Sequence, residues 1–326
     1  MLAFAAGVSS FLPQAGSKAM AAARTAICGS ERIKISLKAR YGRRHRRCRF
    51  LANKIDFAVE FFEKNGFEVS LAKHVLGQHN YFSGTDAERL ADFQAALDDD
   101  SLDFILCARG GYGSVRIIDD LDFTKFVKRP KLIIGFSDIT VFHNHIHTHF
   151  NLPTLHASVP LNFQSNSAEA LQSLVNVLNG KENKYEITPS KYNRAGEAKA
   201  VVVGGNLSIL YSLIGTNSDL TTDGKILFIE DIGEHIYAID RILYSLKKSG
   251  KLQKLAGLLV GGMTNIKDTE IPFGKNVEEV ISEIVAPYNF PVCFNFPAGH
   301  VDDNRAIACG KEARLMVRQN SVTFLQ

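Results

Sequence analysis

The chain has 326 residues, 45% of them apolar, which is enough to bury the core of one large domain or two medium ones. The net charge of +4 is uneven, because residues 1–53 hold eleven of the 38 basic residues and one of the 34 acidic residues, leaving the remainder at −6. A nucleic-acid-binding protein needs a basic face on its folded domain, and this mildly acidic body offers no sign of one, so we expect no nucleic-acid partner. No apolar run reaches the roughly 18 residues of a membrane span, so we expect no membrane partner. The five cysteines are odd in number and form no Cys-x-x-Cys pair, which argues against a disulfide framework or a zinc site.

Residues 1–53 differ in character from the rest. Six arginines lie between Arg40 and Arg49, and the apolar start has no basic residue before it, unlike a secretory signal. Blocks of like charge repel one another and stay solvated, so this segment is typical of a disordered basic extension. An arginine-rich, acid-poor transit peptide is the alternative. We expect few buried side chains here and no strand of a central sheet, a pattern that also fits a misassigned beginning.

Residues 54–180 alternate apolar strands with amphipathic helices. A first helix ends near Asn65-Gly66, which is a favourable C-cap. Strands are expected at 67–69, 104–108 and 131–135, and helices at 87–97, 114–121 and 138–150. This alternation indicates a parallel sheet with helices on both faces.

Residues 181–197 are polar and contain Pro189 and Gly196, which is typical of a linker. Residues 198–326 then read as a second, smaller α/β domain. Its expected strands are 198–203, 225–229, 257–260 and 314–317, and its expected helices are 207–214, 236–249 and 277–284.

The segment Gly135-Phe136-Ser137-Asp138 directly follows an apolar strand and precedes a helix. A serine on such a turn can expose its hydroxyl at the carboxyl end of the sheet, with free helix N–H groups behind it. That is the geometry of a nucleophile elbow, although Ile139 stands where Gly-x-Ser-x-Gly needs glycine. An ordinary helix N-cap is the alternative.

A glycine-rich turn, Arg109-Gly110-Gly111-Tyr112-Gly113, follows the preceding strand. Its glycines let the backbone approach a ligand and point N–H groups toward it. A dinucleotide fingerprint matches poorly, because Arg116 stands where Gly or Ala is needed. An ordinary tight turn is the alternative.

The second domain offers a carboxylate and a histidine. Glu230 lies at the end of a strand, where a carboxylate can orient a histidine, and His300 follows the turn Phe296-Pro297-Ala298-Gly299. A solvated acidic turn and a surface histidine are the alternatives. The histidines between His143 and His149 fall on two faces of a helix without a carboxylate, so we expect no metal site. We also expect no cofactor.

Taken in order, the segments resemble the LD-carboxypeptidase family of serine peptidases. They are Tyr81–Arg89, Arg109–Gly113, Gly135–Thr140, Gly204–Leu207, Leu227–Glu234 and Ala298–His300. The resemblance covers residues 55–326 and implies a flavodoxin-like N-terminal domain, a C-terminal α/β domain and an active site between them.

Carried over residue by residue, the resemblance implies that Ser137 is the nucleophile, Glu230 the orienting acid and His300 the general base. Backbone N–H groups of Gly111 and Asp138 would form the oxyanion hole. The expected substrate-binding residues are Arg109, Tyr112, Asn206 and Glu234. Arg109 would pair with a terminal carboxylate through its guanidinium, with a structural ion pair as the alternative.

The family's usual activity removes terminal D-Ala from cytoplasmic muropeptide tetrapeptides during peptidoglycan recycling, and a homodimer is expected. A relative of the microcin C self-immunity type, which cleaves peptidyl- or aminoacyl-adenylates, is the nearest alternative. A non-catalytic nucleotide-binding module built on the glycine-rich turn is an alternative of another class.

Overall fold

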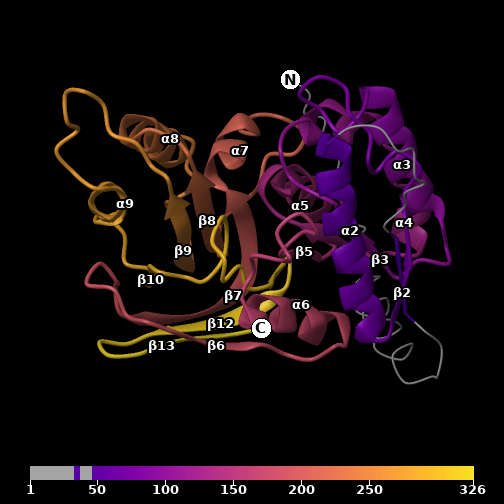
Figure 1. Ribbon diagram of the computed structural model, residues 1–326. Helices are drawn as coiled ribbons and strands as arrows, with labels where there is room; N and C mark the ends of the chain where they lie inside the picture. The colour runs from indigo at the N-terminus through magenta and orange to yellow at the C-terminus, as the bar shows by residue number, and fades with distance from the viewer. Residues whose placement is uncertain (1–32, 37–45) are drawn as a thin grey trace, which may run out of the picture.

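The computed structural model describes residues 33–36 and 46–326, with side chains from residue 52 onward, and it contains two sheets (Figure 1). The first has the strand order β11-β5-β4-β3-β1-β2. Its strands are β1 (Ile33–Ser36), β2 (Phe67–Ser70), β3 (Phe104–Leu106), β4 (Leu132–Gly135), β5 (Thr154–His156) and β11 (Ile307–Cys309). The first five are parallel in the order 2-1-3-4-5, which is the predicted flavodoxin-like arrangement.

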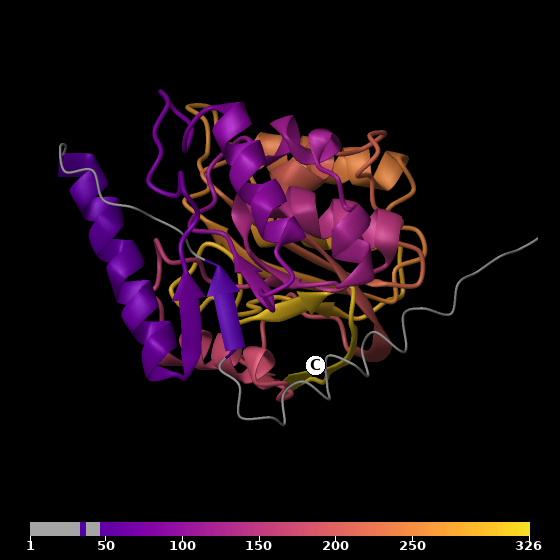
Figure 2. The ribbon, with the colours of Figure 1, turned by 90° about the vertical axis from the view of Figure 1, so that its right-hand side faces the viewer.

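The expectation that residues 1–53 contribute no strand is wrong. The strand β1 lies between β2 and β3 and pairs with both, as Figure 2 shows for the adjacent strands β1 and β2. It is four residues long, and its isoleucines alternate with Lys34 and Ser36, so the surrounding basic residues hid a short period-2 pattern. Helix α2 (Arg46–Lys64) also begins inside that segment, whereas residues 1–32 and 37–45 lie outside the described part.

Helices cover both faces of the first sheet, as predicted. Neighbouring strand residues point to opposite faces. Ile105 and Ile133 pack toward α3 (Asp86–Asp98) and α5 (Thr140–Phe150), while Leu106 and Ile134 pack toward α2 and α6 (Ala168–Leu178). The expected helix at 114–121 is instead two 3₁₀ turns, Ser114–Arg116 and Ile118–Asp120, followed by α4 (Thr124–Lys128).

The second sheet has the order β10-β9-β8-β7-β12-β13-β6. Its strands are β6 (Lys184–Ile187), β7 (Gly196–Asn206), β8 (Ile226–Ile232), β9 (Gly257–Thr264), β10 (Val292–Cys293), β12 (Glu312–Val317) and β13 (Val322–Leu325). Strands β7 to β10 are parallel and the others antiparallel. The helices α7 (Leu207–Ser212), α8 (Ile236–Lys248) and α9 (Val277–Val285) lie over the parallel part (Figure 1).

Two expected boundaries differ from the structure. The segment 181–197 is not a plain linker, because β6 forms the edge of the second sheet by pairing with β13. Residues 198–326 are not confined to one domain, because β11 returns to the first sheet and pairs antiparallel with β5. The chain therefore crosses between the domains again just after His300. Among the described residues, no helix is long and apolar enough to cross a membrane.

Candidate active site

Ser137 stands on a strained turn between β4 and α5. Phe136 is extended, and Ser137 has a φ of +64°, in the left-handed region that non-glycine residues rarely adopt. A 3₁₀ turn, Ser137–Ile139, then leads into the helix. A Cβ at Gly135 would lie 2.8 Å from a side-chain carbon of Ile139, so the tight turn requires glycine there. This is the predicted elbow geometry, with Ile139 packed under the turn where other elbows carry glycine.

The three residues expected to form a triad converge. The Nε2 of His300 lies 3.1 Å from the hydroxyl of Ser137, and its Nδ1 lies 2.7 Å from Oε2 of Glu230. The backbone N–H of His300 donates to the same carboxylate oxygen at 3.2 Å. The predicted contact between Ser137 and His300, which are 163 positions apart in the chain, is thereby confirmed.

Glu230 sits at the carboxyl end of β8 with no exposed surface, and the loop that carries His300 closes over it. Gly299 has a φ of +105°, and a Cβ there would lie 2.7 Å from both Cβ and Oε2 of Glu230. Thr264 donates to the carbonyl of His300 at 3.2 Å, and the ring of Phe136 packs against the imidazole at 4.9 Å. These contacts fix the ring between carboxylate and hydroxyl.

The pKa of His300 is raised above its ordinary value of 6.5. Burial lowers it, but the hydrogen bond and charge of Glu230, helped by the charge of Asp231, outweigh the burial. A more basic imidazole accepts the serine proton more readily, while Glu230 fixes the tautomer that leaves Nε2 free to accept it.

The glycine-rich turn lies against the elbow. A Cβ at Gly110 would lie 2.9 Å from Cβ and 3.2 Å from Oγ of Ser137, so only glycine lets the backbone pass. The buried carboxylate of Asp138 accepts from both the N–H and the hydroxyl of Ser114, at 2.9 and 2.7 Å. These bonds hold the turn containing Gly111 beside the residue that follows the serine.

The expected substrate-binding residues differ in their exposure and in the contacts that their side chains make. Arg109 bonds through Nε to the carbonyl of Gly110 at 3.2 Å, and within the described part of the chain its guanidinium makes no ion pair. Tyr112 is half exposed and contacts the ring of Phe82. Glu234 is partly buried and accepts from Ser208 at 3.3 Å.

Asn206 is buried, and its amide is already engaged. Its Oδ1 caps α7 by accepting from the N–H of Ile209, while Nδ2 donates to Asp231. Its backbone N–H donates at 3.0 Å to the buried hydroxyl of Thr140, one turn after Ser137 on α5. The contact of Asn206 with Thr140 joins the two domains, and sequence reasoning missed it. The pair Gly204-Gly205 was the available signal, because a Cβ at Gly205 would lie 2.4 Å from Oγ1 of Thr140.

The histidines of α5 are structural. His143 bonds to the carbonyl of Gly135, His145 to the hydroxyl of Ser218 and His149 to the carbonyl of Asn217. Burial lowers the pKa values of His143, His145 and His147 to about 4, which keeps these rings neutral near pH 7. Across the described residues, no group of three or more His, Cys, Asp or Glu side chains could hold a metal ion.

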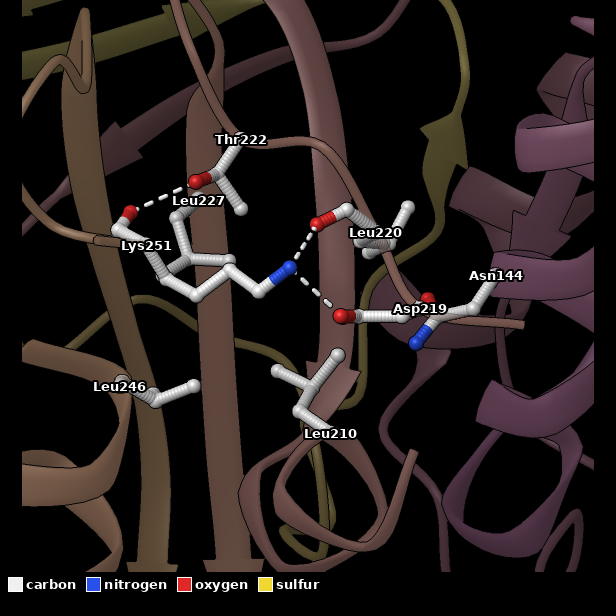
Figure 3. Close-up of a pocket in the computed structure, with 8 residues that line it drawn as sticks. All are labelled: Asn144, Leu210, Asp219, Leu220, Thr222, Leu227, Leu246 and Lys251. Atoms are coloured by element: carbon white, nitrogen blue, oxygen red, sulfur yellow. Dashed lines mark hydrogen bonds and ion pairs between the residues drawn. The ribbon is translucent and has the colours of Figure 1, made fainter. Parts of the chain in front are cut away.

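A small cavity between α5 and the second domain is no substrate site. It measures about 10 Å³, which is room for about one water molecule, and no triad residue lines it. In Figure 3 the amine of Lys251 crosses it to the carboxylate of Asp219, at 2.6 Å, with Asn144 of α5 opposite. The cavity is part of the packing between domains.

A serine on an elbow, a histidine at hydrogen-bond distance and a buried carboxylate behind it define a serine hydrolase built on two α/β domains. Residues 46–157 match the LD-carboxypeptidase N-terminal domain, and residues 199–315 match the LD-carboxypeptidase C-terminal domain. The chain belongs to the LD-carboxypeptidase family, the S66 family of serine-type carboxypeptidases.

Two curated relatives cover most of the chain. A probable murein peptide carboxypeptidase of Bacillus subtilis (strain 168) is 36% identical over 83% of this chain and 86% of its own length. The murein tetrapeptide carboxypeptidase of Pseudomonas aeruginosa is 31% identical over 80% of this chain and 88% of its own length.

Solved structures show the same fold. The muramoyltetrapeptide carboxypeptidase of Oxalobacter formigenes aligns with a TM-score of 0.77 at 28% identity, over 90% of this chain and 98% of its own. The microcin C7 self-immunity protein MccF, in complex with glutamyl sulfamoyl guanosine, has the same TM-score over 90% of this chain and 96% of its own. Its sequence is 20% identical, so the likeness supports the fold alone.

Proposed function

We propose that the protein is a serine LD-carboxypeptidase that removes the terminal D-alanine of murein tetrapeptides through an acyl-enzyme on Ser137. The alignment of Ser137, His300 and Glu230 across the two domains carries the catalytic part of the proposal. The names of the relatives from Bacillus subtilis and Pseudomonas aeruginosa support the substrate class.

The chemistry follows from the geometry. His300 takes the hydroxyl proton of Ser137 on Nε2 as the serine oxygen attacks the carbonyl that precedes the terminal alanine. N–H groups of Gly111 and Asp138 donate to the oxyanion of the tetrahedral intermediate. When the C–N bond breaks, His300 passes its proton to the leaving amine and D-alanine departs. A water molecule, deprotonated by His300, then hydrolyses the ester and restores Ser137.

A carboxypeptidase must recognise a free carboxylate next to the bond that it cleaves. Arg109 begins the turn that lies against Ser137, and within the described residues its guanidinium has no ionic partner. We assign it the terminal carboxylate, which a guanidinium binds through two parallel hydrogen bonds. Tyr112 and Glu234 would contact the rest of the peptide, while Asn206 supports the site from beneath.

The cellular setting belongs to the same proposal. Trimming murein tetrapeptides in the cytoplasm would serve peptidoglycan recycling. We propose a cytoplasmic enzyme acting as a homodimer. Cell fractionation tests the location, and light scattering of the purified protein tests the oligomeric state. A fully active monomer would contradict the proposed homodimer.

A panel of substrates tests the function. Mass spectrometry of a murein tetrapeptide incubated with the enzyme should show loss of one alanine, and a tetrapeptide with an amidated terminus should react far more slowly. An aminoacyl-sulfamoyl adenylate tests the microcin-type alternative in parallel. Cleavage of the adenylate with an intact tetrapeptide would overturn the proposed substrate. Saturable nucleotide binding without any hydrolysis would favour the non-catalytic module.

A further inference from the structure

Asn304 is a buried amide at the junction of the two domains, with 1% of its surface exposed. Its Oδ1 accepts from the backbone N–H of Gly299 at 2.8 Å, one residue before His300. The same oxygen lies 3.3 Å from Nε2 of His156, which belongs to β5 of the first sheet. A carbonyl oxygen has two lone pairs, so it accommodates both donors at once.

The protonation of His156 fits this arrangement. The ring has no exposed surface, and burial holds its pKa well below the ordinary value. The imidazole is therefore neutral, and it donates to Asn304 when its proton is on Nε2. The rings of Phe136 and Phe228 pack against it at 5.8 and 4.8 Å and hold it in place.

The backbone around Asn304 is also attached to the first sheet. Ser158, two residues beyond β5, donates to the carbonyl of Asn304 at 3.3 Å. Three residues later, β11 pairs antiparallel with β5, Ile307 opposite His156. Strand β5 in turn pairs with β4, which leads directly to Ser137. One sheet, β4-β5-β11, thus connects the serine to the segment that follows His300.

We propose that Asn304 is a positioning residue for the proposed reaction, in which its amide oxygen fixes Gly299 and thereby holds His300 between Glu230 and Ser137. It touches no reacting atom itself, so it acts through the loop. Because its second donor is His156 on the serine-bearing sheet, the same bond sets the catalytic base relative to the nucleophile. The inference builds on the proposed serine-peptidase function of the site.

Substituting leucine for asparagine tests the proposal. Asn304→Leu keeps the branched shape and removes the acceptor, which frees Gly299 and loosens the pairing of His300 with Glu230. The matched control is Asn183→Leu, a buried asparagine before β6 whose side chain bonds only to Asn176 and Ser173 among the described residues.

The first readout needs no substrate. Other titratable groups around His300 are Glu230 and Asp231 of β8, which raise its pKa, and the buried His156 of β5. NMR of histidine-labelled protein, with His300→Gln to assign the signal, should place the wild-type midpoint above pH 6.5. Asn304→Leu should move this midpoint downward, while Asn183→Leu should leave it in place. An unmoved midpoint in folded Asn304→Leu overturns the proposal.

The second readout is turnover of the murein tetrapeptide at a temperature where all variants are folded. Asn304→Leu should lower kcat about 10- to 100-fold with KM nearly unchanged, because a base displaced by a fraction of an ångström reacts poorly. Asn183→Leu should lose thermal stability but keep kcat within about twofold. A kcat within twofold of wild type in Asn304→Leu would contradict the inference. If the wild type releases no alanine, the substrate proposal fails while the titration still decides the role of Asn304.

Should Asn304→Leu not fold, His156→Phe tests the same bond from its other end. Phenylalanine keeps the ring packed against Phe136 and Phe228 but removes one of the two donors to Asn304. We expect a smaller fall in kcat and a downward displacement of the His300 midpoint. A variant with unchanged kcat and unchanged midpoint would overturn the proposal.

Discussion

Replacing Glu230 with glutamine removes the charge behind the catalytic histidine while keeping the shape of the side chain. In the wild type, Oε2 accepts from Nδ1 and from the backbone N–H of His300, at 2.7 and 3.2 Å. A glutamine amide that turned its NH₂ toward Nδ1 would stabilise the tautomer with the proton on Nε2. That tautomer cannot take the proton of Ser137.

The expected loss follows from that change. A wrong tautomer in such a triad costs about 10⁴-fold in kcat, or about 5 kcal/mol of transition-state stabilisation. The pH dependence changes as well. The base acts when neutral, so kcat/KM falls as the pH drops below the pKa of His300, which Glu230 raises above 6.5. Without Glu230 the lowering effect of burial remains, so the acidic limb should move below pH 6.5.

Alanine release measured between pH 5 and 9 tests both effects, with Glu197→Gln as the matched control. Glu197 is an exposed carboxylate of β7 that pairs with Arg314, so its loss should leave kcat within about twofold. Thermal melting of Glu230→Gln separates misfolding from lost chemistry. A folded Glu230→Gln enzyme within tenfold of the wild-type kcat, or with an unmoved acidic limb, would refute the reasoning.

Three further outcomes are expected. Gly205→Ala should lower the free energy of unfolding by about 2–4 kcal/mol, because its Cβ would meet Oγ1 of Thr140 and add overpacking to the strain of a positive φ. Gly215→Ala has open space around it and should cost only the strain, about 1–2 kcal/mol. Equal melting temperatures for the two variants would contradict the interdomain contact. Arg109→Ala should raise KM for the tetrapeptide about 10- to 100-fold by removing a charged hydrogen-bond donor, and a KM within twofold would remove Arg109 from carboxylate binding. Burial lowers the pKa of His143 to about 4, so the neutral ring contributes its full share to the free energy of unfolding above pH 6.5. That free energy should decline by about 3 kcal/mol as the pH falls from 6.5 to 4 and the ring takes up a proton. Denaturant titrations in which His143→Gln loses as much stability in acid as the wild type would contradict this role of His143.

Much of the fold could be predicted because its elements carry strong local signals. The helix ending at Asn65-Gly66 and the apolar runs of β3 and β4 lie close to their expected bounds. Three of the shortest strands, β5, β10 and β11, were missed, since each has only two or three residues and gains its stability from pairing. Periodicity cannot reveal such strands, and β1 was hidden by the basic residues on either side.

The candidate site was predictable for a different reason. Ser137, Glu230 and His300 each lie next to a strand end or a glycine turn, and their order along the chain resembled one family. The residues that support them gave no comparable signal. Thr140 accepts a hydrogen bond from Asn206 at 3.0 Å, and Asn304 bonds to His156 and Ser158, each at 3.3 Å, so all three bonds connect segments far apart in the sequence. Their partners depend on the packing of two sheets, which no local pattern encodes.

The most direct test of the account is the turnover of Ser137→Ala. The wild-type enzyme should convert a murein tetrapeptide to tripeptide and free D-alanine. The variant should lose on the order of 10⁴-fold or more in rate while keeping the wild-type melting temperature within a few degrees, because the side chain changes by one hydroxyl. Alanine release by folded Ser137→Ala within tenfold of wild type would contradict an acyl-enzyme on this serine.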